Sequence, residues 1–376
     1  MANNSEPKVT PWEVEGIVDY EKLIVEFGVK KLTSRELELT KEAIGELHPL
    51  IERGVFYAHR DYDVFLRKYI AGEPTALYTG RGPSGYVHLG HIVPWIFTKW
   101  LQDKMGIDLF FEFTDDEKFL YHKEYTLEYV RKITIENILD LISLGFEPKN
   151  THIIVDIDDI SYLYELAVRI AKKITFSTIK AVMGFNTSTN IGMIFYPTLQ
   201  IAVCFLPTEL YGEQTHVLIP AAIDQDPYWR LARDIATSLG YPKPTQIHAK
   251  FLPGLGIGGK MSSSQPETAI FLVDKPEDAR KKIMDAYTGG QPTAELQRRL
   301  GGNPDICPVY KYYEILFEPD DDKLRERYND CRSGNLLCGP CKAALADRVV
   351  SFLEKHQEKR EAMRDRVEEY YLRNKF

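Results

Sequence analysis

Between residues 75 and 285 the chain alternates short apolar segments with longer segments of helical periodicity. The apolar segments are 76–78, 109–113, 153–155, 217–219 and 245–248. Helical spacing follows the first two of them, at about 91–105 and 125–144. Short strands without polar alternation are typical of a parallel sheet that helices cover on both faces. This alternation therefore predicts an α/β fold with a doubly wound parallel sheet.

The pattern changes on both sides of this core. Residues 1–74 carry a helical pattern of their own, and after about residue 286 the β signals stop and helical spacing prevails. In the final charged segment, 354–373, basic side chains could face phosphates, but the interleaved acidic residues are equally typical of a solvated helix. The sequence predicts an N-terminal extension (1–74), an α/β catalytic domain (75–285) and an all-helical C-terminal domain (286–376).

The composition of the 376 residues narrows the class of protein further. Hydrophobic residues make up 44% and charged residues 27%, which is usual for a globular protein and argues against a disordered or fibrous chain. No apolar run approaches the length of a membrane span, and the first residues do not resemble a secretory signal. A formal net charge of -8 argues against a surface coated with nucleic acid, although a local basic face stays open. We therefore expect a cytoplasmic enzyme or binding protein.

A glycine-rich loop, 80–85, follows the first apolar segment and leads to His88-Leu89-Gly90-His91 at the start of the next predicted helix. In parallel sheets, ligands bind beyond the carboxyl ends of the strands and against helix N-termini. Gly90 would let a flat base approach the backbone, and the two imidazoles can donate hydrogen bonds to phosphate oxygens. Taken alone, the tetrapeptide fits a surface loop with two histidines equally well, and its spacing is not that of a helical zinc motif.

A second polar loop, 258–264, lies between later β signals and reads Gly-Gly-Lys-Met-Ser-Ser-Ser. Lys260 is a compact, mobile cation suited to polyphosphate, and the hydroxyl and N–H groups around it can bind phosphate oxygens. Any single serine run is often only a solvated loop. The two loops within one α/β core together favour the functional interpretation.

The two loops resemble the signatures of class I aminoacyl-tRNA synthetases, which are a His-x-Gly-His loop and a Lys-Met-Ser-Lys-Ser loop. In that class the first loop binds the adenine and phosphates of ATP, and the second closes over the pyrophosphate. The chain departs from the second signature at Ser263, where lysine is usual, but it keeps Lys260, so the resemblance implies an active enzyme. It also implies that the α/β domain is of the Rossmann type.

Within the class, the chain is similar to tryptophanyl-tRNA synthetases of the archaeal and eukaryotic cytoplasmic type. The similar segments cover nearly the whole chain and are 11–14, 77–84, 114–118, 222–228, 240–244 and 317–324. The resemblance implies a ligase that activates tryptophan with ATP, releases pyrophosphate and transfers tryptophan to tRNA(Trp). It further implies Mg²⁺ with the ATP, a homodimer, and anticodon binding by the helical C-terminal domain.

The resemblance also implies which residues act on ATP. The residues implied as catalytic are His88, His91, Lys260 and Ser262. The implied ATP site adds Arg81, Gly82, Gly90, Met261 and Ser263. Arg81 would contact the α-phosphate. The protein need not supply a nucleophile, because the carboxylate of the amino acid attacks ATP; its work is alignment and charge stabilisation.

The tryptophan pocket is implied in the same way. Tyr78 would contact the indole nitrogen, and the ammonium and carboxylate of tryptophan would be held by Glu117, Gln200 and Gln225. Glu112 falls where relatives carry a glutamine, the second indole partner. A carboxylate suits that position, because an indole N–H only donates and an ionised glutamate only accepts. Glu112 and Gln200 are also compatible with a purely structural role.

Three alternatives stay open. A tyrosyl-tRNA synthetase shares both loops, and the Tyr78–Glu112 pair could hold a phenol hydroxyl as well as an indole N–H, although 114–118 and 222–228 look tryptophanyl. A nucleotidylyltransferase could use a similar histidine loop, but it would not need the helical C-terminal domain. An inactive synthetase-like RNA-binding protein would not need the intact signature residues.

Four of the five cysteines lie in the predicted C-terminal domain, at Cys307, Cys331, Cys338 and Cys341. Four thiolates gathered in one domain suit a tetrahedral zinc ion or an iron–sulfur cluster. A subset of tryptophanyl-tRNA synthetases is similar, with four cysteines of nearly this spacing that bind a [4Fe-4S] cluster. Free buried thiols and a disulfide are the other possibilities.

Overall fold

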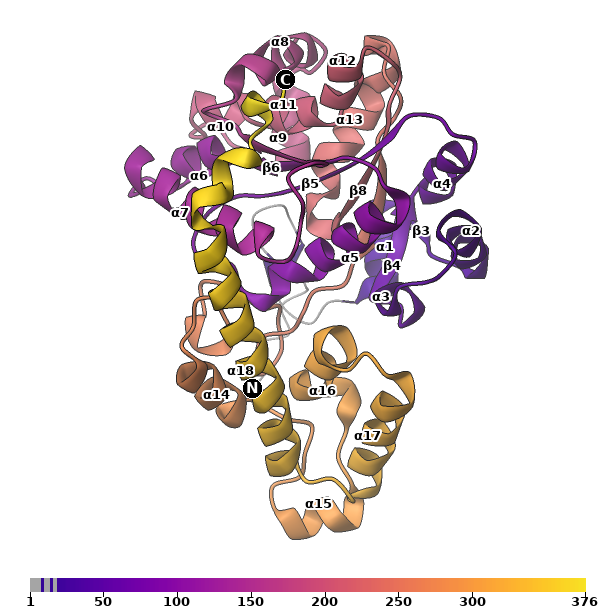
Figure 1. The fold of residues 1–376 in the computed structure, drawn as a ribbon, viewed down its shortest axis with the longest axis vertical. Helices are drawn as coiled ribbons and strands as arrows, with labels where there is room; N and C mark the ends of the chain where they lie inside the picture. Colours follow the sequence, from indigo (N-terminus) through magenta and orange to yellow (C-terminus); the bar gives the residue numbers. More distant parts are fainter. Residues whose placement is uncertain (1–7, 10–13, 16–18) are drawn as a thin grey trace.

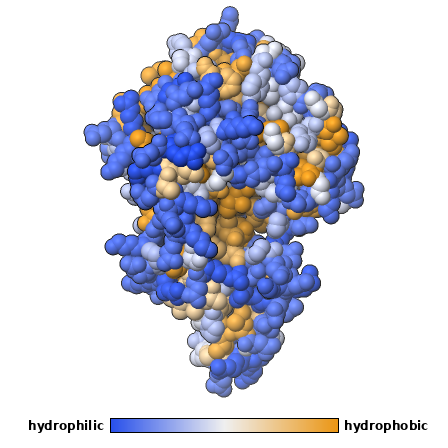
Figure 2. Space-filling view, viewed as in Figure 1, coloured by the Kyte–Doolittle hydropathy of each residue, from blue (hydrophilic) through white to orange (hydrophobic). Residues whose placement is uncertain are grey.

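The computed structural model describes residues 8–9, 14–15 and 19–376. An α/β body and a smaller helical lobe are joined by the long helix α18 (Cys338–Met363), which runs from the lobe up along the body (Figure 1). Figure 2 shows hydrophobic surface in the recess between the two parts and a mostly hydrophilic face elsewhere. In the N-terminal motif 11–14, all residues but the last lie outside the described residues.

The centre of the body is a seven-stranded sheet with the order β3-β4-β9-β8-β5-β6-β7. Five neighbouring strands are parallel: β5 (Thr75–Arg81), β6 (Leu109–Phe113), β7 (Thr151–Val155), β8 (His216–Ala222) and β9 (Thr245–Ala249). They confirm the five predicted strands and the doubly wound fold. The chain runs outward from β5 to β7 and then returns to β8 on the other side of β5, which makes the switch point where such sheets bind ligands.

Part of the predicted N-terminal extension joins this sheet. β4 (Phe56–Arg60) pairs antiparallel with β9, and β3 (Lys30–Lys31) pairs antiparallel with β4. These strands were not predicted, although the helical pattern around them corresponds to α1 (Tyr20–Phe27), α2 (Ser34–Ile44), α3 (Pro49–Glu52) and α4 (Tyr62–Ile70). The pairing covers the edge of β9, whose N–H and C=O groups would otherwise lack sheet partners. β1 (Lys8–Val9) and β2 (Val14–Glu15) form a separate antiparallel pair.

Helices cover both faces of the sheet, because alternate side chains of each strand point to opposite faces. On one face Leu77 and Phe111 pack with α5 (Leu89–Met105) and α7 (Leu127–Ile142). On the other face Tyr78 and Phe110 pack with α8 (Ile160–Ala171), α11 (Pro197–Val203) and α13 (Asp226–Leu239). The remaining helices of the body are α6 (Asp115–Tyr121), α9 (Phe176–Met183), α10 (Ile191–Phe195) and α12 (Leu206–Tyr211). In the part of the chain that the structure describes, no helix is both long and apolar enough to cross a membrane.

The C-terminal part is helical, as predicted. Its elements before α18 are α14 (Pro276–Asp285), α15 (Ala294–Leu300), α16 (Pro308–Tyr312), a π-helical turn (Tyr313–Phe317) and α17 (Asp321–Ser333). α14 packs along α18 although it precedes the predicted boundary at 286. The predicted boundaries of all three domains stay predictions.

The final segment differs from its prediction. α18 ends at Met363 and is followed by 3-10 turns, and the backbone N–H of Ile153 at the β7 edge donates to the carbonyl of Tyr370 at 2.8 Å. The chain leaves the helix because its terminal residues bury apolar side chains against the body and cover this edge. Arg360 is buried and forms ion pairs with Glu136 and Asp140 of α7, so it neither faces phosphates nor lies in solvent.

Candidate active site

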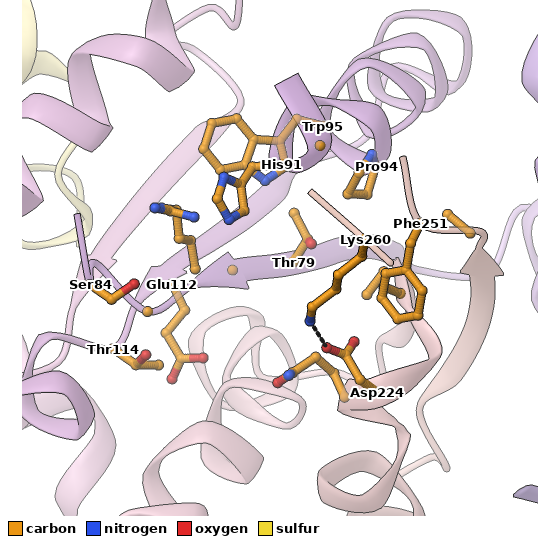
Figure 3. A pocket seen from close by; sticks show the side chains of 18 of the residues that line it. Thr79, Ser84, His91, Pro94, Trp95, Glu112, Thr114, Asp224, Phe251 and Lys260 are labelled. Carbon is orange, nitrogen blue, oxygen red and sulfur yellow. Dashed lines mark ion pairs between the residues drawn. The ribbon is translucent and has the colours of Figure 1, made fainter. Parts of the chain in front are cut away.

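A cavity of about 340 Å³ opens at the carboxyl ends of β5, β6 and β8, at the switch point of the sheet. Every residue that the sequence assigned to ATP or tryptophan lines it: Tyr78, Arg81, Gly82, His88, Gly90, His91, Glu112, Glu117, Gln200, Gln225, Lys260, Met261, Ser262 and Ser263. Figure 3 shows residues of both groups around one space, with His91 and Trp95 on one wall and Asp224 and Lys260 on another. The fold therefore brings together residues far apart in the sequence.

The two histidines form the start of α5. His88 is its N-cap residue, and the backbone N–H of His88 donates to Nδ1 of His91 at 3.1 Å, while the two rings stack with centroids 3.5 Å apart. Burial, followed by the nearby positive charge of Arg81, holds the pKa of both imidazoles well below the ordinary value. Both rings are neutral because their pKa values are lowered. Since Nδ1 of His91 accepts a hydrogen bond, its Nε2 carries the proton, and the two rings can act as N–H donors to an anion at the helix N-terminus.

The second loop follows β9 and lines the same cavity. Gly258 and Gly259 adopt φ of 70° and 80°, a left-handed conformation that glycine accepts readily. Lys260 then points into the cavity, where its Nζ lies 3.5 Å from a carboxylate oxygen of Asp224 and 5.1 Å from the ring centre of Phe251 (Figure 3). The hydroxyls of Ser262 and Ser264 are 2.9 Å apart.

The two loops also touch each other. A Cβ added to Gly90 would lie 3.1 Å from the ring of His88 and 3.5 Å from Cβ of Met261. His88 forms a single antiparallel β-bridge with Phe271, and the N–H of Leu89 donates to the carbonyl of Ile270 at 3.0 Å. The histidine loop thus contacts the lysine loop and the segment that follows it, and Gly90 leaves the space for this contact.

The deep end of the cavity contains the pair formed by Tyr78 and Glu112. These residues lie on the neighbouring strands β5 and β6, and the hydroxyl of Tyr78 donates to the carboxylate of Glu112. The same hydroxyl is 3.2 Å from the backbone carbonyl of Gln200, whose side chain accepts from Tyr196. Burial is the main cause that raises the pKa of Glu112 to about 8. A hydroxyl that donates to Glu112 keeps its lone pairs free to accept a hydrogen bond from a ligand.

The middle of the cavity is acidic on one side. Glu117 is buried and accepts from Nζ of Lys118 at 2.7 Å. A Cβ on Gly82 would lie 2.1 Å from Cε of Lys118 and 2.6 Å from Glu117, so a larger residue there would make these two side chains shift. Gln225 follows β8 and lines the opposite wall.

Arg81 lies at the end of β5, where it also shapes the loop that follows. Its Nε donates to Asn137 of α7, and one terminal nitrogen donates to the carbonyls of Gly85 and Tyr86 at 3.1 and 3.2 Å. Burial lowers its pKa to about 10, so the guanidinium stays charged at neutral pH. Arg81 therefore both supports the loop and contributes positive charge to the cavity.

Asp224 was not predicted as a site residue. It lies directly after β8 and is the carboxylate that meets Lys260 in this structure. The only signal in the sequence was its position beside Gln225 in the segment 222–228. The sequence did not assign a role to Asp224, because nothing in it indicates that the turn after β8 and the lysine loop, which are distant along the chain, lie in contact.

The four cysteines of the C-terminal part line one small cavity of about 20 Å³. A Cβ on Gly290 would lie 2.4 Å from Sγ of Cys338, and one on Gly302 would lie 3.0 Å from Sγ of Cys331, so two glycines make room for the thiols. The thiols are unpaired. Across residues 19–376 no three or more His, Cys, Asp or Glu side chains are arranged to hold a metal ion. The predicted convergence is therefore found, but a ligand geometry is not.

Three comparisons with known proteins identify the family. The family model described as class I tRNA synthetases (W and Y) matches residues 71–354. The tryptophan–tRNA ligase of Pyrobaculum calidifontis is 57% identical over 367 residues, which are 98% of each chain, and that of Pyrobaculum aerophilum is 56% identical over 97% of each. The crystal structure of a tryptophanyl-tRNA synthetase from Encephalitozoon cuniculi bound to tryptophan is similar, with 35% identity, a TM-score of 0.88, and coverage of 96% of this chain and 99% of that one.

Proposed function

We infer that this chain, which belongs to the class I tRNA synthetases for tryptophan and tyrosine, is a tryptophan–tRNA ligase. One observation supports this most directly: a single cavity is lined by both nucleotide-binding loops and by the buried Tyr78–Glu112 pair. The tyrosyl alternative is not favoured, because the full-length relatives reported above are named for tryptophan. An inactive binding protein is not favoured either, since His88, His91 and Lys260 share the cavity.

In the first step, the carboxylate of tryptophan attacks the α-phosphorus of ATP, which enters as its Mg²⁺ complex. The new bond joins the carboxylate oxygen to the α-phosphorus, the bond from that phosphorus to the bridging oxygen breaks, and pyrophosphate leaves. His88 and His91 donate N–H groups to phosphate oxygens at the N-terminus of α5. Preorganised donors of this kind stabilise charge as it develops in the transition state.

Lys260 stabilises the leaving pyrophosphate. Its contact with Asp224 is long, at 3.5 Å, and lies in a loop that begins with two glycines, so binding of a polyphosphate can replace it at small cost. Ser262 adds a hydroxyl and Ser263 a backbone N–H, whereas the N–H of Met261 donates to the carbonyl of Leu252 at 2.9 Å. Arg81 contributes a fixed positive charge near the α-phosphate.

Tryptophan occupies the deep end of the same cavity. The Tyr78–Glu112 pair accepts the indole N–H, and Glu117, Gln200 and Gln225 hold the ammonium and carboxylate. Glu117 is buried and carries negative charge toward the cavity, which suits an ammonium group. This arrangement directs the carboxylate of tryptophan toward the phosphate end.

In the second step, the 2′-hydroxyl of the terminal ribose of tRNA(Trp) attacks the activated carbonyl, and AMP leaves. We place this reaction in the cytoplasm, with the helical C-terminal domain on the anticodon. Bases in a single-stranded loop are read by stacking and by hydrogen bonds to their edges. The tRNA would span both subunits of a homodimer.

The first prediction concerns the amino acid. Pyrophosphate exchange into ATP should depend on tryptophan and be negligible with tyrosine or phenylalanine. A site built to hydrogen-bond a buried donor rejects analogues that leave it unpaired, by a factor of about 10⁴ in favourable cases. The measurement is the exchange rate with each purified amino acid, and equal rates with tryptophan and tyrosine would contradict the assignment.

The second prediction concerns Lys260. If Lys260 acts on the departing pyrophosphate, Lys260→Ala should lower the rate of adenylate formation by roughly 10² to 10³. The affinity for tryptophan should change little, because that pocket lies at the other end. Single-turnover kinetics and tryptophan binding measure the two effects, with Lys281→Ala on the exposed face of α14 as the control. An unchanged turnover would remove Lys260 from the mechanism.

The homodimer has one structural support. Large hydrophobic side chains are exposed on α8, α9 and α10, among them Tyr164, Val168, Phe176 and Ile191. Beside them lies a mostly apolar hollow of about 420 Å³ lined by residues of α9 and α10. Contiguous apolar surface of this kind is typical of protein interfaces. We place the contact between subunits on this face.

The third prediction follows from that placement. Ile191 and Val25 are both 81% exposed, but only Ile191 lies on the proposed interface. Ile191→Glu should therefore shift the protein toward the monomer, whereas Val25→Glu on α1 should leave the dimer intact. Light scattering coupled to gel filtration measures both. A monomeric parent protein, or the same shift in both variants, would rule out this interface.

The fourth prediction concerns the four cysteines. A [4Fe-4S] cluster or a zinc ion at this site stays a proposal that rests on their convergence on one cavity alone, and no step of the reaction depends on it. Anaerobic purification followed by iron, sulfide and zinc analysis should detect one of them. A colourless, metal-free protein with full aminoacylation activity would leave only free thiols or a disulfide.

A further inference from the structure

Three carboxyl groups meet below the deep end of the cavity. Glu112 is in β6, Asp156 directly follows β7, and Asp116 is in α6. In the parallel pairing of β6 with β7, Glu112 lies opposite Ile154, two residues before Asp156, so both carboxyls belong to the same face of the sheet. Glu112 is 1% exposed and Asp156 is 0% exposed, and water therefore cannot solvate them.

No cation neutralises these groups. In the part of the chain that the structure describes, none of the three forms an ion pair with a lysine, arginine or histidine; the nearby Lys118 pairs with Glu117. The other titratable groups that face them are neutral or acidic, namely Tyr78 (β5), Asp115 and Glu117 (α6), Asp158 (after β7), Tyr196 and Cys204 (beside α11) and Tyr228 (α13). Two buried charges of one sign beside a third, half-buried one, without a cation, would be very costly.

The carboxyl oxygens without partners indicate that one of these acidic groups is protonated. Oε1 of Glu112 and both carboxyl oxygens of Asp156 are buried and have no hydrogen-bond donor among the described residues. Asp156 and Glu112 come from neighbouring parallel strands on the same face of the sheet, and hydrogen bonding from Asp156 lowers the pKa of both Glu112 and Asp116. Two ionised carboxylates only accept, so a hydrogen bond between them requires that one keeps its proton.

Of the three carboxyl groups, Asp156 is the one that retains its proton most strongly. Burial, and then the charges of Glu112 and Asp116, raise the pKa of Asp156 well above its ordinary value. Burial raises the pKa of Glu112 to about 8 and that of Asp116 to about 7, while hydrogen bonds from Tyr78 and Asp156 act on Glu112 in the opposite direction. Glu112 and Asp116 therefore ionise before Asp156, and Glu112 does so with help from two donors.

We propose that Asp156 keeps its proton at neutral pH and shares it in a hydrogen bond to Glu112, which favours the ionised form of Glu112 as the acceptor for the indole N–H of tryptophan. Asp156 is a positioning residue in this scheme, because it acts through Glu112 and does not touch the substrate. A carboxylate has about four acceptor positions, enough for the donors Tyr78, Asp156 and the indole. The proposal rests on the tryptophan pocket proposed above.

The scheme has a definite pH dependence. Tryptophan brings a donor and an ammonium group, so it binds best when Glu112 is ionised, and binding lowers the pKa of Glu112. The KM for tryptophan should therefore fall as the pH rises from about 6 toward about 8, by at most about tenfold per pH unit, and then level off. Glu112→Gln should remove this dependence, because an amide does not titrate.

Two variants of Asp156 test the donated proton. Asp156→Asn replaces the O–H donor by an N–H donor of nearly the same shape and should keep the parental KM and pH profile. Asp156→Ala removes the donor, so the fall in KM should move to higher pH and the KM near neutral pH should rise about tenfold, with a smaller change in kcat. Tryptophan-dependent pyrophosphate exchange at several pH values gives both constants.

The outcomes separate the two proposals. If Asp156→Asn behaves like Asp156→Ala, or if Asp156→Ala behaves like the parent, donation by Asp156 is wrong. If the parent shows no tryptophan-dependent exchange, the proposed function fails instead. Infrared spectroscopy of the substrate-free protein is independent of activity: the spectrum of the parent minus that of Asp156→Asn at neutral pH should contain the carbonyl band of a protonated carboxylic acid. Its absence overturns the proposal even if the alanine variant fails to fold.

Discussion

The parallel pairing of β5 with β8 on one side and with β6 on the other is the constraint on which the site depends. Parallel strands end at the same edge of a sheet, so this pairing brings the ends of three strands together although they are distant in the sequence. The reversal of strand order at β5 leaves the crevice open between them. The loops that line the cavity follow β5, β6 and β8 and the neighbouring strand β9.

The charges in this crevice are divided between its two ends. Arg81, Lys260 and two neutral, N–H-donating histidines lie toward one end, and Glu117 and the buried carboxyls lie toward the other. This division suits a polyphosphate and an ammonium group bound next to each other. Burial strengthens both effects, because fewer water dipoles screen the charges. Burial also explains why the carboxyls of Glu112, Asp116 and Asp156 retain protons, since no cation among the described residues pairs with them.

The helical lobe is connected to the site through packed side chains. α18 begins at Cys338, beside the cysteine cavity, and carries Arg360 to the buried Asp140 of α7. Asn137, which is also in α7, accepts a hydrogen bond from Arg81, and Arg81 lines the crevice. His356 completes this network with a ring nitrogen 3.0 Å from Asp140. A single helix thus links the proposed anticodon domain with the catalytic domain through buried contacts.

Much of this protein could be predicted from its sequence, because the relevant signals are local. The apolar strands, the helices after them and the two glycine-containing loops follow from neighbouring residues, and the loops were enough to indicate the family. What the sequence left undetermined depends on contacts between distant segments. Nothing local predicts that residues 56–60 complete the sheet, since an edge strand is defined by the strand it covers.

The same holds for side chains whose chemistry comes from their surroundings. Asp224 gains its partner only where the lysine loop crosses β8, and Arg360 is buried only because α18 packs on α7. Asp156 is an ordinary residue after a strand until β6 places Glu112 beside it in a buried position, where no cation among the described residues pairs with either. Sequence determines which groups can ionise. Tertiary structure decides which of them do, because burial and neighbouring charges set the cost of each charge.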